Sequence, residues 1–164
     1  MLMMPPAPPK PSITKEKVTA SIHGLSHGSA LTHPNRPLPP RSRPAISTEA
    51  TIVKTIGDEV MVVSPDPASL TEWAVEFLSR FPQRPQPRVG IHYGDAVYRD
   101  GDYFGSQVNL VHRVVNRALA GEVLVTDAVC GAISGSESLR FEPIGEVSLK
   151  GFPTPTALFV VRPA

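Results

Sequence analysis

Hydrophobic residues recur at regular intervals only from about Thr51 onward. Thr51–Thr55 and Val60–Ser64 are β-branched, apolar runs on either side of Gly57-Asp58. Glycine at the first central position of a two-residue turn is typical of a type II′ turn, so this segment is predicted to be a β-hairpin. Asp66-Pro67 has the form of a helix N-cap followed by proline at the first helical position. Helical spacing then predicts one buried helix face, which ends at Phe81 and comprises Leu70, Trp73, Ala74, Phe77, Leu78 and Phe81.

The rest of the chain alternates between predicted strands and helices. A strand is expected at Arg88–His92 and again at Ala96–Tyr98, with Gly94-Asp95 as a break and Asp100–Gly105 as a loop. Ser106 to about Leu119 is predicted to be a helix, whose buried face comprises Val108, Val111, Val115 and Ala118. Shorter elements follow: a strand at Glu122–Thr126, a small helix at Asp127–Ile133, and strands near Leu139–Glu142, Glu146–Leu149 and Ala157–Val161. Strands interleaved with helices favour an α+β or α/β sandwich.

Residues 1–50 have a different character. They contain ten of the 19 prolines, each of which removes a backbone donor and restricts the residue before it. Only Ile13–Ile22 has any regular pattern. We therefore predict a disordered, proline-rich tail over 1–50 and a folded domain over 51–164. PPAPPKP and NRPLPPRSRP leave a second interpretation open, namely polyproline ligands for an aromatic groove of an adaptor partner.

Composition narrows the class of protein. A hydrophobic fraction of 41% is enough for a buried core, and a net charge of +1 favours neither nucleic acid nor a membrane surface as a partner. The one cysteine, Cys130, excludes an internal disulfide and a cysteine-based zinc cluster. No apolar run approaches the roughly 20 residues of a membrane span, and prolines interrupt the N-terminus where a signal peptide needs an apolar stretch. A cytoplasmic protein is the expectation.

Four segments resemble, in order and spacing, the catalytic domain of the class III adenylate and guanylate cyclases. They are VKTIGDEVM (53–61), RVGIHYGDAV (88–97), GDYFGSQVNLVHR (101–113) with AGEVLVT (120–126), and LKGF (149–152). The resemblance implies a ferredoxin-like α+β sandwich and the conversion of ATP to cyclic AMP and pyrophosphate. It also implies two Mg²⁺ or Mn²⁺ ions per complete site, held by two aspartates and a backbone carbonyl where two subunits meet as a homodimer or heterodimer.

The resemblance assigns roles to six residues. Asp58 matches one metal-binding aspartate. Lys54 and Asp102 match the pair that reads adenine, so ATP is favoured over GTP. The other three bind ribose or phosphates, and they are Asn109, Arg113 and Lys150. A guanidinium suits charge that develops on phosphates because it presents forked donors.

The sequence departs from the family at two places. His112, beside Val111, replaces one of two small residues before the arginine, and we expect it to be a packed or solvated histidine. More seriously, nothing in residues 1–50 is recognised as the family's opening strand, which carries the other metal aspartate in a pattern like FxDIxGFT and is followed by two helices. That strand is central in the family's sheet, so the domain is expected to be incomplete there. The alternative is that residues 12–22 form a strand that fills this gap.

These departures leave three functions open. The chain is a cyclase-family domain that is inactive alone and complements a complete partner, or it is a non-catalytic pseudo-cyclase that binds nucleotide or dimerises. The third interpretation is a truncated fragment that does not fold stably.

Overall fold

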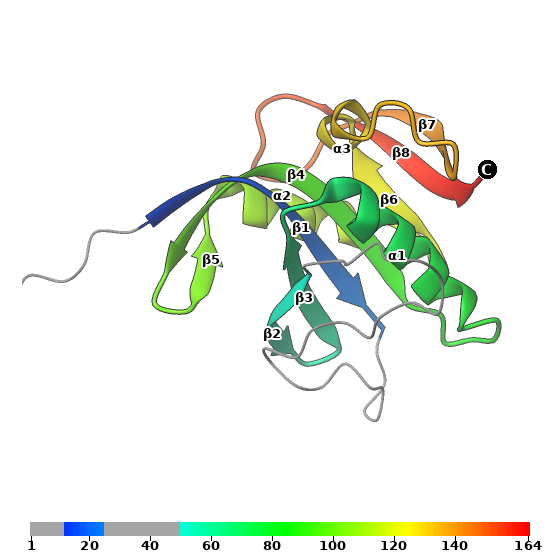
Figure 1. Ribbon diagram of the computed structural model, residues 1–164, viewed down its shortest axis with the longest axis horizontal. Coiled ribbons are helices and arrows are strands. Elements are labelled where there is room, and N and C mark those ends of the chain that lie inside the picture. Colours follow the sequence, from blue (N-terminus) through cyan, green and yellow to red (C-terminus); the bar gives the residue numbers. More distant parts are fainter. Residues whose placement is uncertain (1–11, 25–49) are drawn as a thin grey trace, which may run out of the picture.

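One eight-stranded sheet carries helices on both faces, with strand order β2-β3-β1-β4-β6-β8-β7 and β5 paired to β4 (Figure 1). The structure is a computed structural model, and it describes residues 12–24 and 50–164. The strands are β1 (Ser12–His23), β2 (Thr51–Ile56), β3 (Glu59–Ser64), β4 (Arg88–Arg99), β5 (Asp102–Phe104), β6 (Val123–Thr126), β7 (Leu139–Val147) and β8 (Thr156–Pro163). The helices are α1 (Pro67–Ser79), α2 (Ser106–Arg117) and α3 (Asp127–Ala132). The predicted α+β class is confirmed.

The hairpin and the first long helix form where the sequence predicts them. Strands β2 and β3 pair antiparallel around Gly57, which has φ 61° as the first residue of the turn. Asp66 caps α1 by accepting hydrogen bonds from the backbone amides of Ala68 and Ser69. Proline at the first helical position removes no needed donor, so the helix begins there as expected.

Strand β1 corrects the prediction for residues 1–50. It lies in the middle of the sheet and pairs antiparallel with both β3 and β4, with Ile22 opposite Val60 on one side and Val89 on the other (Figure 1). A tail without regular structure is therefore wrong for residues 12–23, and the alternative in which residues 12–22 fill the place of the first strand is the one found. The predicted polyproline segments, and the residues where the family has two helices after its first strand, lie outside the described residues.

Side chains of the central strands alternate between two faces. Ala20 and Ile22 of β1 belong to a large buried cluster that includes residues of α1, whereas Ser21 points to the opposite side. Helix α2 covers that opposite face, and its apolar side packs on the sheet through Val108, Leu110, Val111, Val114 and Val115. The predicted buried face of this helix is confirmed.

Strand β4 differs from the prediction because it runs unbroken through Gly94-Asp95. Its end pairs with β5 across Asp100 and Gly101, which have φ 52° and 83°. Two residues with positive φ match a type I′ hairpin, for which Asp-Gly is a preferred sequence, so the predicted loop is a tight turn followed by a short strand.

The C-terminal strands are also joined differently from the prediction. Strand β7 is a single element with an irregularity between Pro143 and Gly145, and it ends at Val147. It pairs with β8, which returns along the sheet and pairs with β6.

In the ranges 12–24 and 50–164, none of the helices has the length and apolar character that crossing a bilayer requires.

Candidate functional site

Lys54 and Asp102 form a direct ion pair. Lys54 lies on β2 and Asp102 begins β5, and Nζ of the lysine is 2.7 Å from Oδ2 of the aspartate. Both side chains keep about a third of their surface exposed, 33% and 30%. Asp102 also accepts a hydrogen bond from the backbone amide of Tyr103, which fixes the carboxylate. The structure thus brings together the two residues that the resemblance pairs.

Exposed apolar side chains lie beside this ion pair. The Phe104 ring is 50% exposed, and its centroid is 6.0 Å from Lys54 Nζ. Ile56, which is 57% exposed, lines a small pocket together with Lys54. Large apolar groups at the surface beside polar ones are typical of a site that receives a flat, partly apolar ligand.

Asn109 and Arg113 lie one turn apart on the exposed side of α2. The opposite side of the same helix is buried against the sheet, and this packing fixes the backbone positions of the two residues. Within the part of the chain that the structure describes, no hydrogen bond or ion pair joins them to Lys54 or Asp102. Their convergence with that pair remains a prediction.

Asp58 and Lys150 are both exposed and both lie in turns. Asp58 is at the tip of the β2–β3 hairpin, beyond the strand ends, where a carboxylate is free to meet a cation. Lys150 lies in the turn that follows β7, next to buried Leu149. Their predicted roles in metal and phosphate binding remain predictions.

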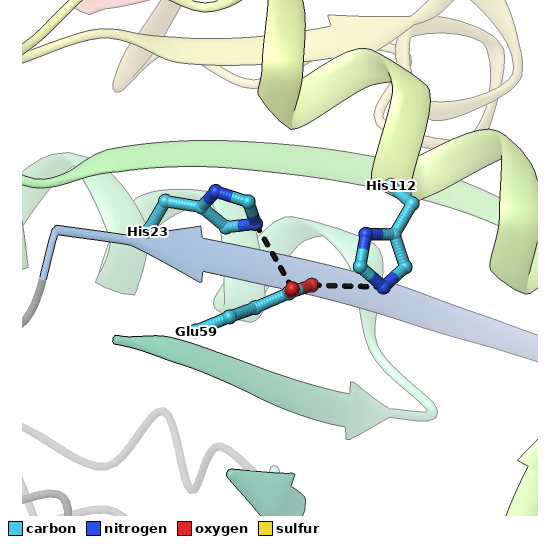
Figure 2. A group of neighbouring side chains, drawn as sticks. All are labelled: His23, Glu59 and His112. Carbon is cyan, nitrogen blue, oxygen red and sulfur yellow. Dashed lines mark ion pairs between the residues drawn. The ribbon is translucent and has the colours of Figure 1, made fainter. Parts of the chain in front are cut away.

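A second group of polar side chains was not predicted from the sequence. His23, Glu59 and His112 converge from β1, β3 and α2 (Figure 2). Nε2 of His23 is 3.2 Å from Glu59 Oε2, and Nε2 of His112 is 3.1 Å from Glu59 Oε1. Ser21 donates a hydrogen bond of 2.5 Å to Glu59 Oε1. His112 was expected to be either packed or solvated, and in the structure it packs against Glu59.

Two other titratable side chains, Cys130 and His92, belong to neither of the two groups described above. Burial, with a smaller effect of Asp127, raises the pKa of the Cys130 thiol to about 11, so the thiol stays protonated and is a poor nucleophile. His92 is buried and its Nδ1 lies 2.8 Å from Thr126 Oγ1. Burial lowers the pKa of this imidazole below its ordinary value, which a hydrogen bond to Gln107 only partly offsets.

Comparison with known families identifies the domain. The family model of the adenylate and guanylate cyclase catalytic domain matches residues 45–162. The chain belongs to this family. Among curated relatives, a pH-sensitive adenylate cyclase of Mycobacterium tuberculosis is 40% identical over 116 residues, which is 67% of this chain and 29% of the relative. The chain thus spans less than a third of that relative's length.

Solved structures of the cyclase family share the fold. The catalytic core of a rhodopsin-guanylyl cyclase with converted specificity, in complex with ATPαS, aligns with a TM-score of 0.71 at 15% identity and covers 94% of this chain and 99% of that one. The adenylyl cyclase CyaB from P. aeruginosa aligns with a TM-score of 0.65 at 20% identity, covering 94% and 97%. At these identities, the likeness concerns the fold.

Two residues, one in β1 and one just after it, agree with the family's opening pattern. The isoleucine and the glycine of FxDIxGFT would correspond to Ile22 and Gly24, and that register would set Ser21 at the aspartate; the family model itself matches from residue 45 onward. Ser21 is buried on the α2 side of the sheet. In the sequence this register rests on two matching residues, Ile22 and Gly24, in proline-rich surroundings.

Cyclase catalytic domains generally use divalent metal ions. Among the described residues, the resemblance assigns a metal-binding role to Asp58 alone, and one carboxylate is not enough for a pair of such ions. Asp58 offers one exposed carboxylate, whereas Ser21, which the register above would set at the second, has a hydroxyl that donates to Glu59. A neutral hydroxyl is a weak ligand for a hard dication, which prefers carboxylate oxygens.

Proposed function

We propose that this chain is an adenylate cyclase-type domain that supplies the base-selecting and charge-neutralising side of a composite ATP site. It does not form cyclic AMP on its own. The single observation that carries the proposal is the contact of 2.7 Å between Lys54 and Asp102. The expected partners are ATP and a second catalytic domain, in a homodimer or a heterodimer.

The Lys54–Asp102 pair fits adenine better than guanine. A lysine ammonium only donates, and adenine N1 only accepts. A carboxylate only accepts, and the 6-amino group of adenine donates. Guanine presents the opposite pattern on this edge, so both protein groups would face like groups and lose their hydrogen bonds. Exposed Phe104 and Ile56 beside the pair supply apolar surface for the purine faces.

An exposed ion pair of this kind adds little to folding. Partly exposed lysine–carboxylate pairs stabilise proteins by about 0–1 kcal/mol. Because the pair joins β2 to β5, its main effect is to hold both groups at a defined spacing at the sheet edge. That spacing supports a binding role.

Asn109 and Arg113 supply the polar side of the proposed site. Both project from α2 into solvent, where a second subunit or a nucleotide can meet them. We propose that Arg113 stabilises charge on the reacting phosphate, Asn109 orients the ribose, and Lys150 binds the terminal phosphates.

The chain is proposed to be inactive on its own because its part of the metal-binding site lacks one carboxylate. In the register proposed for β1, Ser21 stands at one metal-binding aspartate in each copy of the chain, so a homodimer would lack that carboxylate at every site. A partner domain with both aspartates would complete one site, in which this chain contributes Lys54, Asp102, Asn109 and Arg113.

Complementation tests this proposal. The full chain is mixed with a complete class III catalytic domain whose own base-reading lysine and arginine have been replaced, so that neither protein has a full site. Cyclic AMP is expected only in the mixture. Arg113→Ala should lower the rate of the mixture by about 100- to 1000-fold, which is typical for loss of one group that stabilises transition-state charge.

Arg117→Ala is the matched control, since Arg117 is also exposed and lies one turn further along α2. It should leave the rate unchanged. An inactive mixture, or equal rates for Arg113→Ala and the unchanged chain, would exclude complementation. Turnover of ATP by the pure chain with Mn²⁺ would show that the chain is not inactive alone.

The second candidate is a non-catalytic module that binds nucleotide or dimerises. The hydroxyl of Ser21 in place of a carboxylate favours it, because base recognition by Lys54 and Asp102 does not need that carboxylate. Calorimetry would then show ATP binding that is weakened by Lys54→Ala, with no turnover in any mixture.

A further inference from the structure

Three side chains with metal-binding atoms meet between β1, β3 and α2. The carboxylate of Glu59 lies between the imidazoles of His23 and His112, as Figure 2 shows. One ligand atom of each residue lies within 4.8 Å of the others. None of these residues belongs to the set that the family resemblance assigns to metal or nucleotide.

Each contact between Glu59 and a histidine is close to the spacing of neighbouring ligands around a tetrahedral ion. Bonds of about 2.0–2.2 Å to imidazole nitrogen and carboxylate oxygen place neighbouring ligand atoms about 3.4 Å apart in a tetrahedron. The observed distances from Glu59 oxygens to His23 and His112 are 3.2 and 3.1 Å. Taken with one ligand atom from each residue, the three atoms lie within 4.8 Å of one another, so side-chain shifts of about an ångström would bring them to tetrahedral spacing.

One of the three groups is incompletely satisfied without an ion. Among the described residues, Nε2 of His23 is buried and has no hydrogen bond of acceptable geometry, although Glu59 is near. Glu59 already accepts from Ser21 and is only 12% exposed. A buried polar atom without a partner costs free energy, and coordination would remove that cost.

We propose that His23, Glu59 and His112 form a binding site for a transition-metal dication, specifically Zn²⁺. Two imidazoles and one carboxylate are a ligand set that zinc uses when a fourth position is left to water. Mg²⁺ and Ca²⁺ prefer oxygen ligands throughout, so the site should discriminate against Mg²⁺, one of the ions expected for cyclase chemistry. His112 is 39% exposed, which gives the ion and its water a route from solvent.

A bound ion would connect the helix to the sheet. His23 and Glu59 lie on neighbouring central strands, and His112 lies on α2 one residue before Arg113. Zn²⁺ would thus fix the turn of α2 that carries Arg113, and it would bind Glu59 directly behind Asp58 at the hairpin tip. The site is a means by which a metal other than the catalytic one restrains this helix.

Zn²⁺ titration of the full chain tests the site. Calorimetry should show one saturable site for Zn²⁺ and none of comparable affinity for Mg²⁺. His112→Ala should raise the Kd for Zn²⁺ by more than about 100-fold, which exceeds what loss of a hydrogen-bond partner of a ligand costs. Zn²⁺ at about 100 times its Kd should raise the thermal midpoint by roughly 5–10 °C in the unchanged chain.

Two further measurements keep the outcome decisive. The double variant His27→Asn/His33→Asn removes histidines outside the described residues and should keep the affinity. Co²⁺ in the unchanged chain should give the intense visible absorption of a four-coordinate site, independently of any variant's folding. Absence of Zn²⁺ binding, affinity that survives His112→Ala, or affinity lost only with His27 and His33 would overturn the proposal.

Discussion

At the scale of single residues, His92 shows how burial changes chemistry. Its imidazole is 7% exposed on the α2 side of the sheet and lies against Thr126. Desolvation is the main reason that its pKa is lowered from 6.5, and it outweighs the opposing effects of Gln107 and Asp127. The neutral imidazole is therefore the form that the folded state holds.

This shift makes stability depend on pH. In the unfolded chain, His92 takes up a proton at its ordinary pKa of 6.5, whereas the folded chain takes it up only at lower pH. The unfolded state thus binds more protons in this window, so the free energy of unfolding should fall as pH drops below 6.5 toward the lowered value. Denaturant unfolding between pH 7.5 and 5 should show a smaller fall for His92→Gln. Equal slopes would contradict the prediction.

The roles of some site residues could be predicted from the sequence, whereas those of others could not. Lys54 and Asp102 are 48 positions apart, yet the family motifs around them predicted a pair, and they are in contact. The family motifs contain Glu59 and His112 but give neither a role, and their meeting with His23 depends on the β1–β3 register and on which way α2 faces. Such contacts between distant segments leave no periodic signal in the chain.

At the scale of elements, the close approach of α2 to β4 depends on Gly90. A Cβ at this position would lie 2.5 Å from the backbone nitrogen of Val115, and 2.8 Å from its Cα. Backbone atoms in a packed helix cannot move aside without displacing the helix. Glycine is needed at position 90 because there is no room for a Cβ atom.

Gly90→Ala should therefore destabilise the fold by about 1–3 kcal/mol, the usual cost of overpacking a core, or by more if α2 must shift. Gly131→Ala is the matched control, since a Cβ there meets nothing within 4 Å and Gly131 lies inside α3. The control should be neutral or stabilising by up to about 1 kcal/mol. Denaturant midpoints for both variants test this, and equal stabilities would count against close packing at Gly90.

The elements that the sequence predicted are those with a strong local pattern. The β2–β3 hairpin, α1 and α2 follow from turn chemistry, capping and helical periodicity. Strand β1 could not be predicted with the same certainty, because only its last residues alternate clearly and prolines surround it. Tertiary pairing on both sides determines that strand.

At the scale of the whole molecule, β1 is the strand that joins two parts of the sheet. It lies between the β2–β3 hairpin and β4, and Ala20 and Ile22 are fully buried beneath α1. Without it, β3 and β4 would each expose a row of unpaired backbone groups. The predicted domain boundary at Thr51 would divide this sheet.

A chain of residues 51–164 should consequently fail to fold cooperatively. The loss of one central strand removes backbone hydrogen bonds on two sides as well as core side chains. A circular dichroism melt should show no sharp transition for 51–164, whereas deletion of residues 1–11 should preserve one. A cooperative melt of 51–164 at the temperature of the full chain would show that β1 is dispensable.

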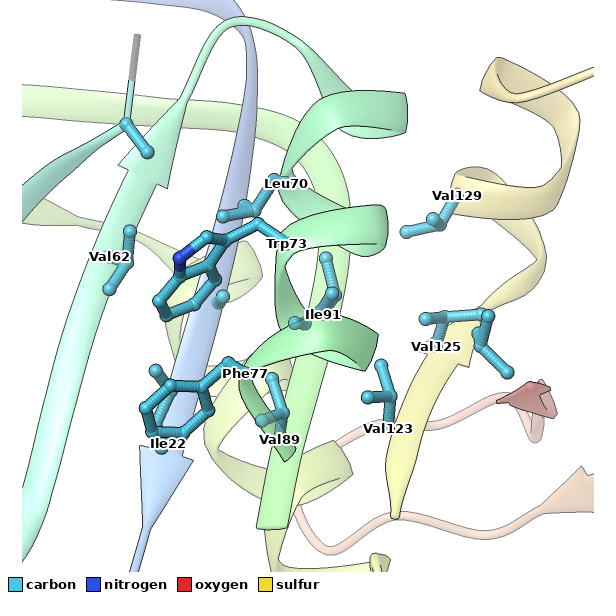
Figure 3. Close-up of a cluster of buried hydrophobic side chains, with 14 of the residues drawn as sticks. Ile22, Val62, Leu70, Trp73, Phe77, Val89, Ile91, Val123, Val125 and Val129 are labelled. Atoms are coloured by element: carbon cyan, nitrogen blue, oxygen red, sulfur yellow. The ribbon is translucent and has the colours of Figure 1, made fainter. Parts of the chain in front are cut away.

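The core offers its own reporter of this assembly. Trp73 is the chain's one tryptophan, and it stacks on Phe77 with ring centroids 5.1 Å apart, inside the cluster that contains Ile22, as Figure 3 shows. Its indole is 7% exposed. Intrinsic fluorescence of the unlabelled protein will therefore follow the docking of β1 beneath α1, and a stopped-flow trace of that signal would time when the central strand is inserted.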